Sequence, residues 1–109
     1  MTVNELLRFE ELTALYLADG ERETNGVYIG DLLSWVMGRA QADQIWVTIM
    51  SNINVLAVAS LTDVACVILA DSVTLSDDVL SAAKEKGINV LQSRLPAFET
   101  ARLLFGEHS

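Results

Sequence analysis

The sequence is poor in the residues that most often form disulfides, metal sites and catalytic dyads. Its 109 residues include one cysteine, one histidine and one proline. The cysteine, Cys66, lies inside the apolar run 64–69, so the chain can form no internal disulfide and no cysteine metal cluster. This cysteine usage fits a reducing compartment, and we expect a cytoplasmic protein.

Catalytic patterns are equally scarce. The histidine, His108, is the penultimate residue, and Cys66 lies in the middle of an expected strand, so neither pairs visibly with a base or nucleophile. Scattered carboxylates with one histidine and one cysteine predict no metal site and no cofactor. The six glycines form neither G-x-x-x-x-G-K-[ST] nor G-x-G-x-x-G, so phosphoryl transfer is unsupported. We expect that the protein is not an enzyme.

Basic residues are also few. Seven Lys and Arg stand against 15 Asp and Glu, which gives a net charge of −8. The basic residues are scattered from Arg8 to Arg102, whereas phosphate backbones are bound by clustered positive charge, so we expect no nucleic-acid binding. The apolar fraction is nevertheless 51%. Because monomers rarely expose large apolar patches, we expect a homodimer that covers part of this surface.

A membrane span and an export signal are both unexpected. The uncharged window 44–62 is nominally long enough to cross a bilayer, which takes about 20 apolar residues. The polar residues Ser51, Asn52 and Asn54 occupy its middle, where unpaired polar groups are costly. The N-terminus carries acidic residues instead of a basic region followed by an apolar run. A buried strand turning into a buried helix is the simpler interpretation of this window.

Alternating patterns of strands and helices predict the fold class. We expect helices over residues 2–9, 31–38, 52–61, 76–87 and 96–106, and strands over residues 12–18, 27–29, 45–49, 65–70 and 88–92. Short links between these elements predict right-handed crossovers and helices on the faces of a sheet. The sequence therefore predicts an α/β protein, a small three-layer α/β/α domain with a mostly parallel sheet, in which residues 1–109 form a single domain.

Capping residues set the expected helix boundaries. Thr2 and Glu5 form a capping-box pattern, Asp31 can cap the second helix, and Gly38 can end it. Ser76 opens the fourth helix ahead of two aspartates, and Gly87 closes it after two lysines.

Small polar groups follow four of the expected strands at their carboxyl ends. In open α/β sheets ligands bind outside this edge, where helix N-termini present free N–H groups. Serine, asparagine and aspartate are also ordinary helix caps, so capping and ligand binding both remain open. The candidate ligand-binding residues are Gly30, Asp31, Ser34, Ser51, Asn52, Asn54, Asp71, Ser72, Ser93 and Arg94.

The two tryptophans present a choice between core and interface. Trp46 lies in an expected buried strand, and we assign it to the core. Trp35 lies beside Met37 in the second helix, and we assign both to the dimer interface because aromatic residues and methionine are enriched there.

Residues 26–104 resemble the DRTGG domain family, small α/β modules related to the N-terminal domain of HPr kinase/phosphorylase. Three phrases carry the resemblance: GVYIGDLLSWVMGRA, WVTIMSNINVLAVASLTDVACVILAD and EKGINVLQSRLPAFETARLL. The naming motif of the family would fall in the loop after the strand 45–49. This sequence has Ser51-Asn52-Ile53-Asn54 there and keeps no Asp, Arg or Gly.

The resemblance implies a regulatory or accessory module, because such domains accompany CBS pairs in pyrophosphatases and also occur alone in anaerobic bacteria. It implies no kinase activity, which in HPr kinase/phosphorylase belongs to a separate phosphate-loop domain. Our first hypothesis is a non-catalytic, homodimerising module that senses a small molecule or nucleotide. The alternatives are an accessory subunit with a protein partner in a redox enzyme system, of the kind found in hydrogenase-type gene neighbourhoods, and an enzyme that acts on a phosphorylated substrate.

Overall fold

The computed structural model describes residues 1–106, so our predictions for residues 107–109, including His108, lie outside the described residues. Five helices and five strands make up this part of the chain, and they alternate except that two strands follow the first helix. They are α1 (Val3–Leu6), β1 (Leu12–Tyr16), β2 (Val27–Ile29), α2 (Leu33–Arg39), β3 (Ile45–Thr48), α3 (Ile53–Thr62), β4 (Cys66–Leu69), α4 (Asp77–Lys86), β5 (Val90–Ser93) and α5 (Ala97–Gly106).

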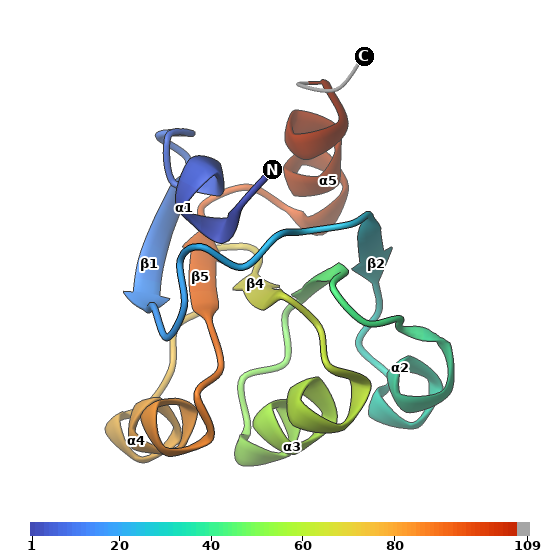
Figure 1. Ribbon diagram of the computed structural model, residues 1–109, viewed down its shortest axis with the longest axis vertical. Helices are drawn as coiled ribbons and strands as arrows, with labels where there is room; N and C mark the ends of the chain where they lie inside the picture. Colours follow the sequence, from blue (N-terminus) through green and yellow to red (C-terminus); the bar gives the residue numbers. More distant parts are fainter. Residues whose placement is uncertain (107–109) are drawn as a thin grey trace.

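The strands form one mixed sheet in the order β1-β5-β4-β3-β2. Strands β2 to β5 are parallel, and β1 pairs antiparallel with β5 at one edge. Helices α2, α3 and α4 cover one face of the sheet, while α1 and α5 lie on the other face (Figure 1). The predicted α/β class and the mostly parallel sheet between two helical layers are therefore confirmed.

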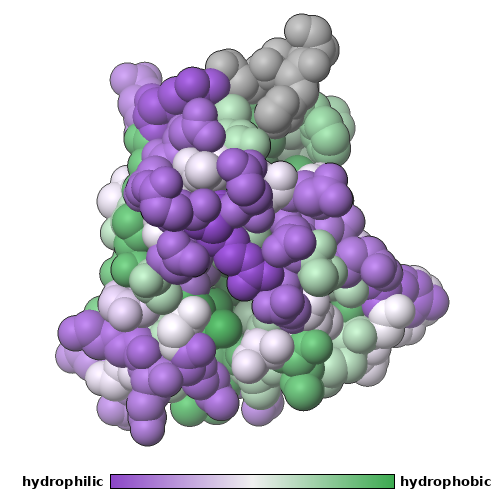
Figure 2. All heavy atoms as spheres, in the orientation of Figure 1, coloured by the Kyte–Doolittle hydropathy of each residue, from purple (hydrophilic) through white to green (hydrophobic). Residues whose placement is uncertain are grey.

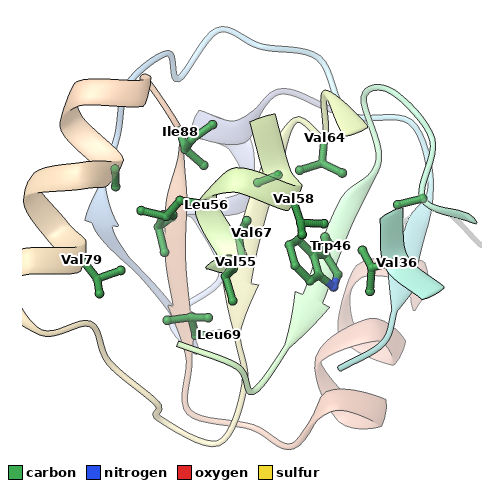
Figure 3. Packing of buried hydrophobic residues seen from close by; sticks show 14 residues of the cluster. Val36, Trp46, Val55, Leu56, Val58, Val64, Val67, Leu69, Val79 and Ile88 are labelled. Atoms are coloured by element: carbon green, nitrogen blue, oxygen red, sulfur yellow. The ribbon is translucent and has the colours of Figure 1, made fainter. Parts of the chain in front are cut away.

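Alternation along the buried strands divides the core between the two faces, because successive side chains of a strand point to opposite sides. Trp46, Val67 and Leu69 pack against α2, α3 and α4 (Figure 3). Val47 and Ile68, their neighbours in sequence, pack on the face that carries α1 and α5. Both faces are covered, which explains why β4 is apolar throughout and β3 is apolar up to its last residue. The prediction that Trp46 belongs to the core is confirmed.

The capping pattern at the N-terminus forms as predicted. The Thr2 hydroxyl accepts a hydrogen bond from the Glu5 backbone N–H at 3.2 Å, and a Glu5 carboxylate oxygen accepts one from the Thr2 backbone N–H at 2.8 Å. The backbone hydrogen bond from Thr2 is the main cause that lowers the pKa of Glu5. The helix itself ends at Leu6 and not near residue 9, because a turn leads directly into β1.

The predicted boundaries of α2 are wrong at both ends. Leu32 occupies the N-cap position, and no side chain caps this helix. The Asp31 carboxylate, which we expected to be the cap, accepts hydrogen bonds from the end of β3 instead. Gly38 lies inside the helix, which continues to Arg39. A single glycine costs a helix only about 1 kcal/mol relative to alanine, and packing of the helix on the sheet outweighs that amount.

Asn89, which is 4% exposed, connects three segments just before β5. Its Oδ1 accepts hydrogen bonds from the backbone N–H groups of Ala18 and Asp19 at 2.7 and 2.8 Å. Its Nδ2 donates to the carbonyl oxygens of Asp19 and Ala65 at 2.9 and 3.0 Å. The amide thereby uses both of its acceptor positions and both of its donors within the protein, and it holds the end of β1 beside the beginning of β4.

Candidate functional site

The parallel strands β2, β3, β4 and β5 end at the same side of the sheet, which we call the carboxyl edge. The ten candidate ligand-binding residues all lie at these strand ends, directly after them, or in the first turn of the next helix. They form two groups along the edge. One group surrounds the ends of β2 and β3, and the other surrounds the ends of β4 and β5.

In the first group, Asp31 connects two loops. Its Oδ1 accepts hydrogen bonds from the Thr48 hydroxyl at 2.7 Å and from the Ile49 backbone N–H at 3.0 Å. The Gly30 carbonyl accepts a third bond, from the indole Nε1 of Trp46 at 2.9 Å. These contacts fix the loop after β2 against the end of β3, while the Asp31 side chain remains exposed to solvent.

The loop between β3 and α3 is a turn that caps the helix. The Asn52 side-chain oxygen accepts a hydrogen bond from the Asn54 backbone N–H at 2.9 Å, so capping, one of the two roles left open for these residues, is what Asn52 performs in this structure. Ser51 is half-buried, and the Asn54 side chain is exposed beside Ser34 of α2. This polar break therefore joins two buried elements and leaves an exposed polar side chain at the helix N-terminus.

In the second group, the loops after β4 and β5 bind to each other. The backbone N–H of Ser72 donates to the Ser93 carbonyl at 2.8 Å, and that of Asp71 donates to the Leu95 carbonyl at 2.9 Å. Asp71 and Ser72 are exposed and both adopt positive φ, at 56° and 58°, which is unusual for residues other than glycine.

The last two candidate residues have contrasting environments. The Ser93 hydroxyl is buried at 2.7 Å from the hydroxyl of Thr100 in α5, so it supports the loop from inside. The Arg94 side chain is 58% exposed and forms an ion pair with Glu10 at 3.4 Å. An exposed ion pair of this length contributes little to stability.

Hollows of different character mark the described surface. A groove of about 320 Å³ separates α2 from α3 and includes the candidate residues Ser34 and Asn54. A mostly apolar hollow of about 270 Å³ lies between the start of β2 and the end of α5. A polar hollow of about 220 Å³ lies at the opposite edge of the sheet from the candidate residues, beside Arg22 and Asp63.

The Arg22 cluster is a polar site that the sequence patterns did not reveal. Its guanidinium donates to carboxylate oxygens of Asp43 at 2.9 Å and Asp63 at 3.1 Å, and to the Asp63 carbonyl at 2.7 Å. Burial lowers the pKa of Arg22, but the hydrogen bonds that Arg22 donates to the two carboxylates, together with their negative charge, outweigh burial, so the net pKa is raised. The three residues are far apart in sequence. Hydrophilic residues accordingly cover the centre of the view in Figure 2, where the β1–β2 connection passes.

Cys66 has the environment of a structural residue. Its side chain is fully buried, and this burial raises the pKa of the thiol to about 12, against a small opposing effect from Arg22. A thiol with this pKa is protonated at neutral pH and is a poor nucleophile.

Within residues 1–106, no three His, Cys, Asp or Glu side chains gather so that they could hold a metal ion. None of the helices described in this part of the chain is long and apolar enough to cross a membrane.

Comparison with known proteins gives one family and one informative structure. The DRTGG domain family matches residues 9–106. No curated protein matches the chain. Among solved structures, the chain is similar to the CBS and DRTGG domains of the regulatory region of Clostridium perfringens pyrophosphatase, crystallised with its activator diadenosine tetraphosphate. The TM-score is 0.74 at 15% sequence identity, and the match covers 94% of this chain but 45% of the other.

Proposed function

Because the chain belongs to the DRTGG domain family, we propose that it is a non-catalytic regulatory module that senses a small ligand at the carboxyl edge and acts as a homodimer. The observation that carries this proposal is the likeness of fold, over 94% of the chain, to a regulatory region that was crystallised with a nucleotide activator. The chain spans less than half of that region, so it corresponds to part of such an assembly.

The arrangement of connections supports a ligand site near the ends of β4 and β5. The connection after β4 leads to α4 on one face of the sheet, whereas the connection after β5 leads to α5 on the other face (Figure 1). Ligands of open α/β sheets bind where neighbouring connections diverge in this way. Arg94 supplies exposed positive charge there, and Asp71 and Ser72 supply exposed polar groups. The site is therefore suited to a small anionic ligand such as a nucleotide.

The remaining candidates extend this site along the carboxyl edge. Asp31, Ser34, Asn52 and Asn54 are exposed and Ser51 is half-buried, so their polar atoms lie within reach of a ligand at the edge. Gly30 and Ser93 form the backbone and buried support beneath them.

A thermal-shift panel tests the ligand. Nucleotides, including diadenosine tetraphosphate, are added to the wild type, to Arg94→Gln and to Ser51→Ala. Arg102→Gln is the matched control, because it removes one exposed positive charge from α5 without changing the carboxyl edge. We expect a nucleotide to raise the melting temperature of the wild type and of the control, with a smaller rise in the other two variants. If no nucleotide shifts the wild type, the ligand proposal fails.

A second candidate is an accessory subunit that binds a protein partner in a redox enzyme system. The exposed Trp35 side chain, 55% accessible, favours a protein contact of some kind. Affinity purification from the native cell separates the two candidates: stoichiometric recovery of a redox enzyme subunit with the chain would support the second candidate over the first.

A further inference from the structure

The outward side of α3 is apolar and carries no charge. Ile53, Ala57 and Leu61 follow one another at intervals of four residues, which places them on one side of the helix. Ile53 is 53% exposed, Leu61 is 72% exposed, and Ala57 between them is half-buried. The inward side of the same helix fills the core, so the outward stripe has no role in packing the monomer.

This stripe continues into the groove between α2 and α3. The groove has a volume of about 320 Å³. We use the name uncharged face for the stripe and the groove together, formed by Leu33, Ser34, Met37, Ile53, Asn54, Ala57, Val58 and Leu61. Apolar residues are visible at the lower end of Figure 2, where α3 lies in Figure 1.

The distribution of charge distinguishes this face from the rest of the molecule. Between Leu32 and Thr62 the sequence has only two charged residues, Arg39 and Asp43, although the chain has 15 acidic residues. Asp43 lies away from this face in the cluster with Arg22. The Arg39 guanidinium lies over the Trp35 ring at 3.9 Å from its centroid. The face is therefore neutral on a chain whose net charge is −8.

We propose that the uncharged face binds the same face of a second copy across a twofold axis; this deepens the proposed function and rests on its homodimer clause. In a twofold interface each residue near the axis meets its own copy, so an acidic surface would bring like charges together. Two copies of this strongly acidic chain can approach without that repulsion through the uncharged face. A standard interface covers about 800 Å² per partner, about one seventh of the 5643 Å² surface of this chain.

In this proposal the twofold axis runs perpendicular to α3, and this orientation fixes which residues meet. Ala57, at the middle of the stripe, lies at the axis, and its small side chain lets the two α3 helices approach at the usual distance of about 8–10 Å. The helices run antiparallel, so Ile53 of one protomer packs against the partner's Leu61. Met37 lines the neighbouring groove and extends the contact onto α2.

Sedimentation equilibrium on the full chain tests this arrangement, with circular dichroism to verify folding. We expect the wild type to be a dimer at micromolar concentration. Leu61→Glu and Ile53→Lys are each expected to weaken dimerisation about a hundredfold, because the axis introduces each charge twice. An equimolar mixture of the two variants should dimerise again, since the carboxylate introduced in one chain then faces the ammonium group introduced in the other. Phe98→Glu, on α5 at 66% exposure, is the matched control and should remain dimeric.

The outcomes separate this inference from the broader proposal. A monomeric wild type would overturn both the interface and the homodimer clause. The proposed interface would be overturned if Leu61→Glu and Ile53→Lys remained dimeric, or if the control dissociated as they do. Either result would mean that a dimer of the wild type forms through another surface. Two monomeric variants that fail to associate on mixing would overturn the antiparallel register. The ligand-dependent thermal shift, measured on the wild type and on Leu61→Glu, reports on ligand sensing independently, because Leu61 lies at the opposite end of α3 from the candidate residues Asn52 and Asn54.

Discussion

Replacing Asn89 by alanine tests whether this buried amide holds three segments together. The side chain exchanges four hydrogen bonds with backbone groups of Ala18, Asp19 and Ala65, at 2.7 to 3.0 Å. Alanine shortens the side chain to a methyl group and so removes all four bonds at once. The bond to Ala65 is buried, and the other three are partly reached by water.

The expected loss follows from these environments. An ordinary hydrogen bond contributes about 1 kcal/mol net, and a buried group left without a partner costs about 1–3 kcal/mol. Water can replace part of the bonds at Ala18 and Asp19 but not the bond at the buried Ala65 carbonyl. We therefore expect Asn89→Ala to lower the free energy of unfolding by about 3 kcal/mol, a large part of the stability of a domain of this size.

Urea denaturation followed by circular dichroism measures this loss. Both proteins are compared at one protein concentration, because the proposed dimerisation would make apparent stability depend on concentration. Asn25→Ala is the control, since this exposed asparagine lies in the β1–β2 connection and should change stability by less than about 0.5 kcal/mol. A loss below about 1 kcal/mol for Asn89→Ala would refute the reasoning, because it would mean that water satisfies the four groups.

Three further outcomes follow from other contacts. Cys66 should react with a thiol reagent at pH 8 only as fast as the protein unfolds, and rapid alkylation of the native protein would contradict this. Because burial raises the pKa of its thiol to about 12, the contribution of Cys66 to stability should be present at neutral pH and decline as pH rises above about 8.5. Thr2→Ala should lower the free energy of unfolding by about 1 kcal/mol in urea denaturation. Because the pKa of Glu5 is lowered in the folded state, the stabilising effect of the Glu5 charge should be present above the ordinary pKa of glutamate and disappear on acidification, and Glu5→Gln should abolish this pH dependence. Arg22→Gln should lower the free energy of unfolding by about 1–2 kcal/mol, whereas the control Arg102→Gln should change it little. Equal effects of the two substitutions in the same denaturation assay would contradict a stabilising role of the Arg22 cluster.

Local signals in the sequence predicted the elements whose ends are set by neighbouring residues. The fourth helix is the best example: Ser76 caps it through the Val79 backbone N–H, and Gly87 ends it at φ 67°. Long-range contacts overrode the local signal at Asp31. This aspartate has the position of a helix cap in sequence, but the Thr48 hydroxyl and the Ile49 backbone N–H compete for its carboxylate. No local pattern reports that competition.

The sequence predicted where the carboxyl edge lies but not the contacts that its candidate residues make. Parallel strands bring their carboxyl ends together whatever the loops contain, so the sequence located the edge. The packing of Ser93 against Thr100 depends on where α5 lies, which the helix pattern does not specify. The Arg22 cluster was missed because Asp43 and Asp63 lie 21 and 41 residues after Arg22 in the sequence. Trp46 was assigned correctly because uninterrupted apolar strands are buried on both faces.

The pairing of the first strand with the last one has a consequence for biosynthesis. Leu12 lies opposite Ser93, so β1 leaves the ribosome long before β5 has been made. During translation β1 has no neighbour, while β2, β3 and β4 can already associate in the order in which they emerge. Because contacts distant in sequence are closed late and slow folding, the sheet can be completed only after β5 has been made. Although β1 is made before the other four strands, it is thus among the last to reach its final place, and a ribosome stalled before β5 would hold a chain in which β1 is unpaired.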